Sequence, residues 1–199
     1  MSYPEIPNIV PIREDMQVTT GIARASFASV IAPKPNMSDA NKLEYQIVLI
    51  FPGDSPTIPV LRAVVRDAII KKWPSKIPAG LRDPIRDASE KSYEGFEPGH
   101  FYLTCRSGER PGVIDAALKP ITDPAELYSG CFVRARLSAF AYDKAGNRGV
   151  AFGLSHVQKL ADGPTLTGRR SASDVFGVVV VPTDPFGAAK ENAMGDLFA

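Results

Sequence analysis

The stretch Cys131–Tyr142 alternates aromatic rings and guanidinium groups with small apolar residues. Alternate residues of an extended strand face opposite sides, so the apolar set, from Cys131 to Ala141, would face a core. The other side would present Phe132, Arg134, Arg136, Phe140 and Tyr142. Rings stack on bases of any identity, and arginines neutralise phosphates. This side is therefore expected to bind single-stranded nucleic acid.

An alternative explains the same strand without nucleic acid. The aromatic side could pack under a helix or in an oligomer interface, with the arginine side chains extended along the apolar surface to reach water. The protein would then be a structural or interaction protein. Salt dependence separates the two hypotheses, because neutralising phosphates releases counterions.

A second strand, Gly99–Arg106, repeats the pattern more weakly, with Tyr102 and Arg106 on one side. We expect this strand to lie beside the first and to widen the binding surface into a basic groove. The connecting segments add further aromatic and basic candidates. These are Arg82, Arg86, Lys91, Arg110 and Lys159, with Tyr93 and Phe96 in the loop of residues 82–97.

Catalytic chemistry is poorly supported by the sequence. His100 and His156 are the only histidines, and no second pair of ligands completes a zinc site. A Cys–His nucleophilic pair stays open, but Cys105 and Cys131 lie on predicted core faces, where a thiol is usually inert. No glycine-rich phosphate loop is present. We therefore expect no enzyme activity, no metal and no cofactor.

The strands that would position these residues are separated by segments rich in turn-forming residues. One predicted helix lies between two of the strands. Strands are predicted at 18–32, 44–51, 99–106, 128–143 and 149–159. Alternation in the first puts Phe27 on the same side as Ala23 and Ala25. Apolar residues at helical spacing predict a helix from Ile58 to Trp73. Residues 74–98, rich in Pro, Gly and charge, predict a long connection.

Five strands, one amphipathic helix, long loops and a C-terminal extension predict a mainly β protein, a five-stranded Greek-key barrel of the OB type. The chain of 199 residues suits one domain with elaborations. We expect an N-terminal arm at 1–17, the barrel at 18–170 and a tail at 171–199. No apolar run is long enough to span a bilayer, and residues 1–15 do not resemble a secretory signal, which predicts a cytoplasmic protein.

Charge is unevenly distributed along the chain, although the net charge is only +1. The segment after residue 170 is acidic, and the remainder is mildly basic. The charged residues of this tail are Asp174, Asp184, Lys190, Glu191 and Asp196. A basic body with an acidic tail is compatible with nucleic-acid binding but is common in soluble proteins.

Several ordered motifs resemble a phage and prophage family long catalogued as uncharacterised. They are Tyr93–Leu103, Arg110–Asp115, Tyr128–Arg134 and Asn147–Lys159, followed by Asp162–Pro164, Gly168–Arg169 and Ser173–Phe176. The likeness covers roughly residues 25–176, and ordered motifs over such a span are more specific than a single one. That family is similar to the single-stranded DNA-binding proteins of T-odd phages.

The resemblance implies an OB barrel that coats single strands during phage replication or recombination. It also implies a homodimer and an acidic tail that contacts replication proteins or the DNA groove. The chain departs from the family pattern because the valine run Val178–Val181 precedes its end. Asp196–Phe198 still offers an acidic and aromatic tip.

Overall fold

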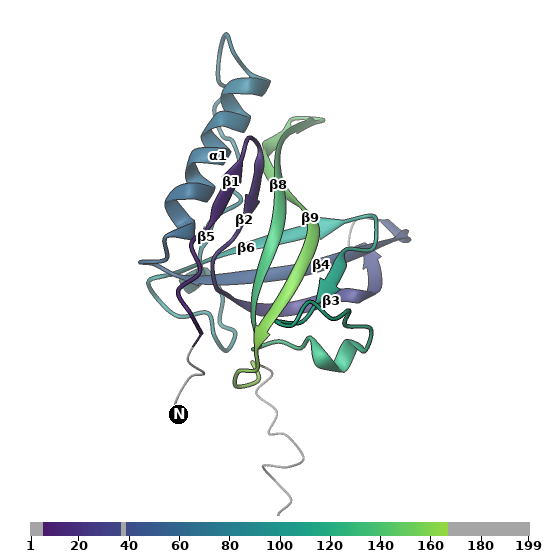
Figure 1. The fold of residues 1–199 in the computed structure, drawn as a ribbon. Coiled ribbons are helices and arrows are strands. Elements are labelled where there is room, and N and C mark those ends of the chain that lie inside the picture. The colour runs from purple at the N-terminus through teal and green to yellow at the C-terminus, as the bar shows by residue number, and fades with distance from the viewer. Residues whose placement is uncertain (1–5, 37–38, 167–199) are drawn as a thin grey trace, which may run out of the picture. The chain divides into compact units, whose positions relative to one another are not determined.

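The computed structural model describes residues 6–36 and 39–166, which lie within one compact unit. Its elements in chain order are β1 (Ile12–Glu14), β2 (Gln17–Thr19), β3 (Ala23–Asn36), β4 (Asp39–Pro52), α1 (Thr57–Lys72), β5 (Arg86–Asp87), η1 (Ala88–Glu90), β6 (His100–Ser107), β7 (Gly112–Ile114), η2 (Pro124–Glu126), β8 (Phe132–Lys144) and β9 (Asn147–Ala161) (Figure 1). The expected tail at 171–199, with Val178–Val181 and the tip, lies outside the described residues.

Five strands close into a barrel. β3 pairs with β4, β4 with β6, β6 with β9, β9 with β8, and β8 returns to β3. All of these pairs are antiparallel except β6 and β9, which run parallel at Cys105 and Phe152. Closure by a returning, non-sequential pair is the Greek-key arrangement of the OB-fold, so the predicted fold class is confirmed.

Side chains that alternate along these strands fill the barrel. Ile47, Leu49, Leu103, Val133 and Leu137 are fully buried and pack in one cluster. Each buried side chain of this size contributes about 1.5–3 kcal/mol relative to an exposed one. The alternation seen in the sequence of β8 is therefore real, because Val133, Ala135 and Leu137 all point inward.

The predicted helix is confirmed as α1, which begins one residue earlier than expected. Leu61, Val64 and Ala68, at helical spacing, bury the apolar side of α1 in the core of the barrel. Lys71 and Lys72 lie in the last turn, where positive charge complements the helix dipole. Within the described ranges, no helix has the length and apolar character that crossing a bilayer would require.

The N-terminal segment differs from the sequence-based expectation. Part of residues 1–17, expected as an arm or an irregular edge, forms the regular hairpin of β1 and β2, and β2 pairs with β8 at Gln17–Thr19. The tight turn has Asp15 at φ 50°, a left-handed conformation that Asp tolerates better than most residues. Strands of three residues are too short for alternation to reveal them.

Candidate nucleic-acid interface

Four aromatic side chains form a cluster on the outer face of β3, β4 and β6. Phe27 and Tyr93 meet edge to face with centroids 5.2 Å apart, and Phe96 lies 5.9 Å from Tyr93. Phe96 in turn packs 5.3 Å from Tyr102 of β6. Phe96 and Tyr102 are buried, whereas Phe27 is 45% exposed and Tyr93 is 56% exposed. The cluster therefore has a buried base and two rings open to solvent.

Phe27 reaches this face through an irregularity in β3. The pairing register with β4 shifts between Ser26 and Ser29, and Phe27 adopts φ 47°. A positive φ is uncommon for a bulky residue and indicates a locally strained backbone. The expectation that Phe27 shares the inward face of Ala23 and Ala25 is therefore wrong. A β-bulge interrupts the strict alternation of side chains along a strand, and no pattern in this sequence predicts the bulge.

Three basic side chains come from the strands that carry the aromatic cluster or from segments next to them in the chain. Arg106 of β6 donates from Nε to Oε1 of Gln46 at 3.0 Å and lies 3.4 Å from the carboxylate of Glu44. Arg86 of β5 stands opposite Tyr102 in the β5–β6 pair, which puts the two side chains on the same side. Both arginines are exposed, as is Lys91 at the end of η1.

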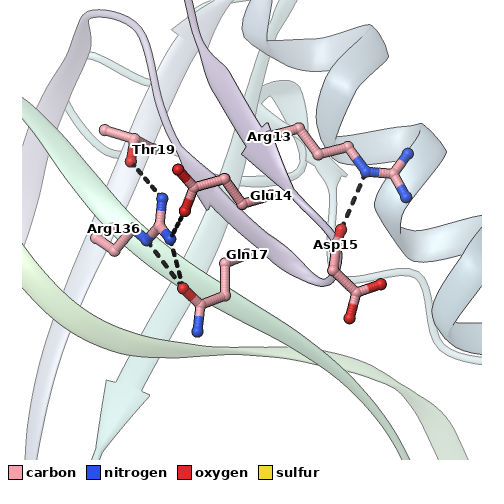
Figure 2. A network of polar contacts seen from close by, with 6 residues as sticks. All are labelled: Arg13, Glu14, Asp15, Gln17, Thr19 and Arg136. Carbon is pink, nitrogen blue, oxygen red and sulfur yellow. Dashed lines mark hydrogen bonds and ion pairs between the residues drawn. The ribbon is translucent and has the colours of Figure 1, made fainter.

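The arginines of β8 are engaged within the protein. Arg134 donates from Nε to Oε1 of Gln158 at 2.7 Å, across the pair formed with β9. Arg136 is ion-paired with Glu14 and donates to Gln17 and Thr19, with 3.0 Å between Nη1 and the Thr19 hydroxyl (Figure 2). Arg136 thus fastens the β1–β2 hairpin to the barrel.

The aromatic side chains of β8 are spread along the strand. Phe132, at its start, lies half-buried under the guanidinium of Arg24, whose carbon is 5.7 Å from the ring centroid. Phe140 is 50% exposed, and Tyr142 is half-buried near the hairpin to β9. Both lie opposite small residues of β9, namely Ala151 and Gly149.

The remaining predicted residues are scattered. Arg82 forms an isolated bridge with Gly149 at the start of β9, and Arg110 is exposed before β7. Lys159 of β9 lies 2.7 Å from Asp162 and 5.5 Å from the ring centroid of Tyr128. The hydrogen bond from Lys159 lowers the pKa of the Asp162 carboxyl, and burial raises the pKa of the Tyr128 hydroxyl.

The expected groove over adjacent strands Gly99–Arg106 and Tyr128–Asp143 is corrected by the topology. These strands are β6 and β8, which do not pair with each other within residues 6–36 and 39–166, because β9 lies between them on one side and β3 and β4 on the other. The β4–β6 side of the barrel carries Tyr102, Arg86, Lys91 and Arg106. The β8–β9 side carries Arg134, Arg136, Phe140, Tyr142 and Lys159. Phe132 lies at the boundary, where β8 meets β3.

Sequence reasoning missed Phe27 as a candidate and did not place Tyr93 and Phe96 among its principal binding residues. Tyr93 and Phe96, three residues apart in a polar, Gly-containing loop, were the available signal. Nothing in the sequence of β3 pointed to Phe27.

Both cysteines are free and buried, as expected. Burial raises the pKa of the Cys131 thiol to about 11 and raises that of Cys105 further. A thiol in such surroundings stays protonated and unreactive at neutral pH.

Comparison with known proteins decides the family. A family model described as the ssDNA-binding protein of Enterobacter phage Enc34 matches residues 16–186. The chain belongs to this family. One relative is protein p50 of Acyrthosiphon pisum secondary endosymbiont phage 1, which is 29% identical to this chain over 169 residues. The match covers 79% of this chain and 90% of p50.

Solved structures agree with the fold of this Enc34-type protein. The single-stranded DNA-binding protein of bacteriophage Enc34, in complex with ssDNA, superposes with a TM-score of 0.65 at 16% identity, covering 82% of this chain and 99% of that one. The single-stranded DNA-binding protein gp2.5 of bacteriophage T7 gives a TM-score of 0.53 at 14% identity, covering 78% and 97%. At these identities the likeness establishes the shared barrel.

Proposed function

We propose that this protein binds single-stranded DNA without reading its sequence and supports phage DNA replication or recombination. Membership of the Enc34-type family supports the ligand class. The observation that supports the location is the exposed aromatic pair Phe27 and Tyr93 on the outer face of β3, β4 and β6. In OB-folds, the face of the second and third barrel strands commonly binds oligonucleotides, and here those strands are β4 and β6.

Binding combines stacking with charge neutralisation. Bases stack on the exposed rings of Phe27 and Tyr93, which accept any base because every base has a π-face. Arg86 and Lys91 are exposed on the same side as the rings and neutralise phosphates, which makes the affinity fall with salt. Arg106 contributes less, because it already pairs with Gln46 and Glu44. Buried Phe96 and Tyr102 hold the two exposed rings in place, so less side-chain entropy is lost when a base stacks.

The β8–β9 side is the second candidate surface for the strand. Phe140 supports it, because its ring is half exposed beside Ala151. Arg134 and Arg136 support it less, because breaking their internal hydrogen bonds would offset part of the energy gained from phosphates. Phe132 borders both surfaces. A longer DNA strand could follow the barrel from Tyr102 past Phe132 and contact both.

The proposal also covers the domain organisation, the oligomeric state and the partners of the protein. We propose a barrel domain over residues 18–170 followed by a tail, a homodimer, and contacts of the tail with replication proteins in the host cytoplasm. These features follow from the resemblance to the phage DNA-binding proteins. The function requires binding alone, and we propose that the protein has no catalytic activity.

The test is fluorescence anisotropy of the full chain with labelled oligo-dT, oligo-dA and a duplex of equal length, each titrated at several salt concentrations. We expect both single strands to bind, and both to bind more tightly than the duplex. The logarithm of the affinity should fall linearly with the logarithm of the salt concentration. Absence of binding to single strands at low salt would contradict the proposed function and favour a structural or interaction protein.

A further inference from the structure

A cavity of about 470 Å³ lies next to the aromatic cluster. Its lining includes Gly95, which lies in the chain between Tyr93 and Phe96, and Ile50, which packs in the same small cluster as Phe96 and Tyr102. The cavity therefore adjoins the surface on which bases are proposed to stack. Its volume lies within the range of about 300–1,000 Å³ typical of small-molecule sites.

The walls of the cavity match the chemistry of a nucleobase, which has flat apolar faces and a polar edge. Ile50 and the ring of Phe132 supply apolar walls. Asn8, Glu97 and His100 supply hydrogen-bonding groups. Nδ1 of His100 is buried without a hydrogen-bond partner, which is costly unless a ligand or water satisfies it.

A phosphate fits this cavity less well than a base. Asp54 and Glu97 both line it, and their carboxylates would repel an anion. Arg24 also lines the cavity, but it donates from Nη2 to the Pro164 carbonyl at 2.7 Å and covers the Phe132 ring. The guanidinium is thus already oriented by the protein.

We propose that this cavity receives one nucleobase turned out of the stacked strand, an inference that rests on the proposed function. The carboxylates of Glu97 and Asp54 accept hydrogen bonds from the exocyclic amino group of cytosine or adenine, a group that thymine lacks. Binding is then indifferent to sequence along the stacked strand but prefers an amino-bearing base at one position. Extruding a single base from an unpaired strand costs only its stacking.

The first experiment moves a single 2-aminopurine, a fluorescent base with an exocyclic amino group, through the shortest oligo-dT that the full chain binds. At one position we expect the bound fluorophore to be protected from acrylamide quenching much more strongly than at its neighbours. Even protection along an oligonucleotide that still binds would overturn the cavity assignment and leave the proposed function standing. Failure of oligo-dT to bind at all would contradict the proposed function, and the cavity proposal with it.

The second experiment places dC or dT at the protected position and compares the two affinities. We expect a preference for dC of roughly tenfold to 150-fold, the effect of one hydrogen bond to a charged group. Glu97→Gln keeps the size of the side chain and removes its charge, so the ratio should fall, because an amide oxygen is a weaker acceptor than a carboxylate. The matched control is Glu126→Gln, in η2 at an exposed position outside the cavity lining, which should keep the preference. An unchanged ratio in Glu97→Gln would overturn the role of Glu97.

Discussion

The rings of Phe27 and Tyr93 lie edge to face, with centroids 5.2 Å apart and planes at 74°. Phe27 comes from the irregular point of β3, and Tyr93 comes from the connection between η1 and β6. An edge-to-face pair leaves at least one ring face of each partner uncovered by the other. Two exposed aromatic faces at an angle to each other form a surface on which a flexible single strand can stack.

Replacing Tyr93 by Ala should weaken binding to oligo-dT. Base stacking on an aromatic side chain contributes about 1–3 kcal/mol, so the Kd should rise roughly fivefold to 150-fold, as measured by anisotropy. Phe27→Leu should act in the same direction, because it keeps apolar bulk and removes the ring. The effect should be similar for oligo-dT and oligo-dA.

Phe140→Ala is the matched control, since Phe140 is an equally exposed ring on the β8–β9 side. We expect a smaller loss of affinity in this variant than in Tyr93→Ala. The reverse order, with both variants folded, would move the binding surface to β8 and support the original hypothesis for Phe132, Phe140 and Tyr142.

Arg86→Gln should reduce the salt dependence of binding. Arg86 stands beside Tyr102 on the aromatic side of the sheet, where it can neutralise one phosphate. Loss of one phosphate contact lowers the slope of log affinity against log salt by about one. Arg66→Gln, at an exposed position of α1, should leave the slope unchanged. If the slope of log affinity against log salt is equal in the two variants, Arg86 does not contact a phosphate.

Local patterns in the sequence predicted most of the fold. Alternation in β8 and helical spacing in α1 identified elements whose buried sides form the core, because periodicity reflects burial directly. The β1–β2 hairpin was missed because strands of three residues have no measurable period. Closure of the barrel by β8 and β3 depends on contacts between distant residues, which a periodicity in one segment does not reveal.

The candidate site was harder to predict for the same reason. The alternation of β8 correctly put Arg134 and Arg136 on the outward side, but the sequence could not show that Gln158 and Glu14 would engage them. Phe27 was put on the same side as Ala23 and Ala25 because alternation assumes a regular strand, and the β3 irregularity broke that rule. Outward-facing side chains are predictable, whereas their partners require the tertiary structure.

Arg136→Ala should destabilise the protein. The side chain is only 22% exposed, and its removal leaves polar groups of Glu14, Gln17 and Thr19 without their donor. We expect a loss of about 1–3 kcal/mol in the free energy of unfolding, measured with urea. Arg148→Ala removes a single surface ion pair, the one with Asp143, and should cost less than about 1 kcal/mol. Normal stability with a reduced salt slope in Arg136→Ala would instead identify a phosphate contact.

Cys105 and Cys131 should resist thiol reagents in the folded protein. Both are buried, and burial raises their thiol pKa values, so little thiolate exists at neutral pH. Reaction with a chromogenic disulfide should be slow in buffer and fast in denaturant, with both thiols titrating after unfolding. Rapid modification of either thiol in buffer would show that the barrel opens locally around it.

Asp162 should make stability depend on pH in the acidic range. The hydrogen bond from Lys159, aided by Tyr128, lowers the carboxyl pKa from its ordinary value of 3.8. A carboxyl with a lowered folded pKa contributes stability that is present above its unfolded pKa and is lost as the pH falls through the folded value. Asp162→Asn should therefore be less stable than the parent protein at pH 6, and the difference should shrink towards pH 3. Urea unfolding at both pH values tests this, and a difference that is constant with pH would show that Asp162 acts through packing and not through its charge.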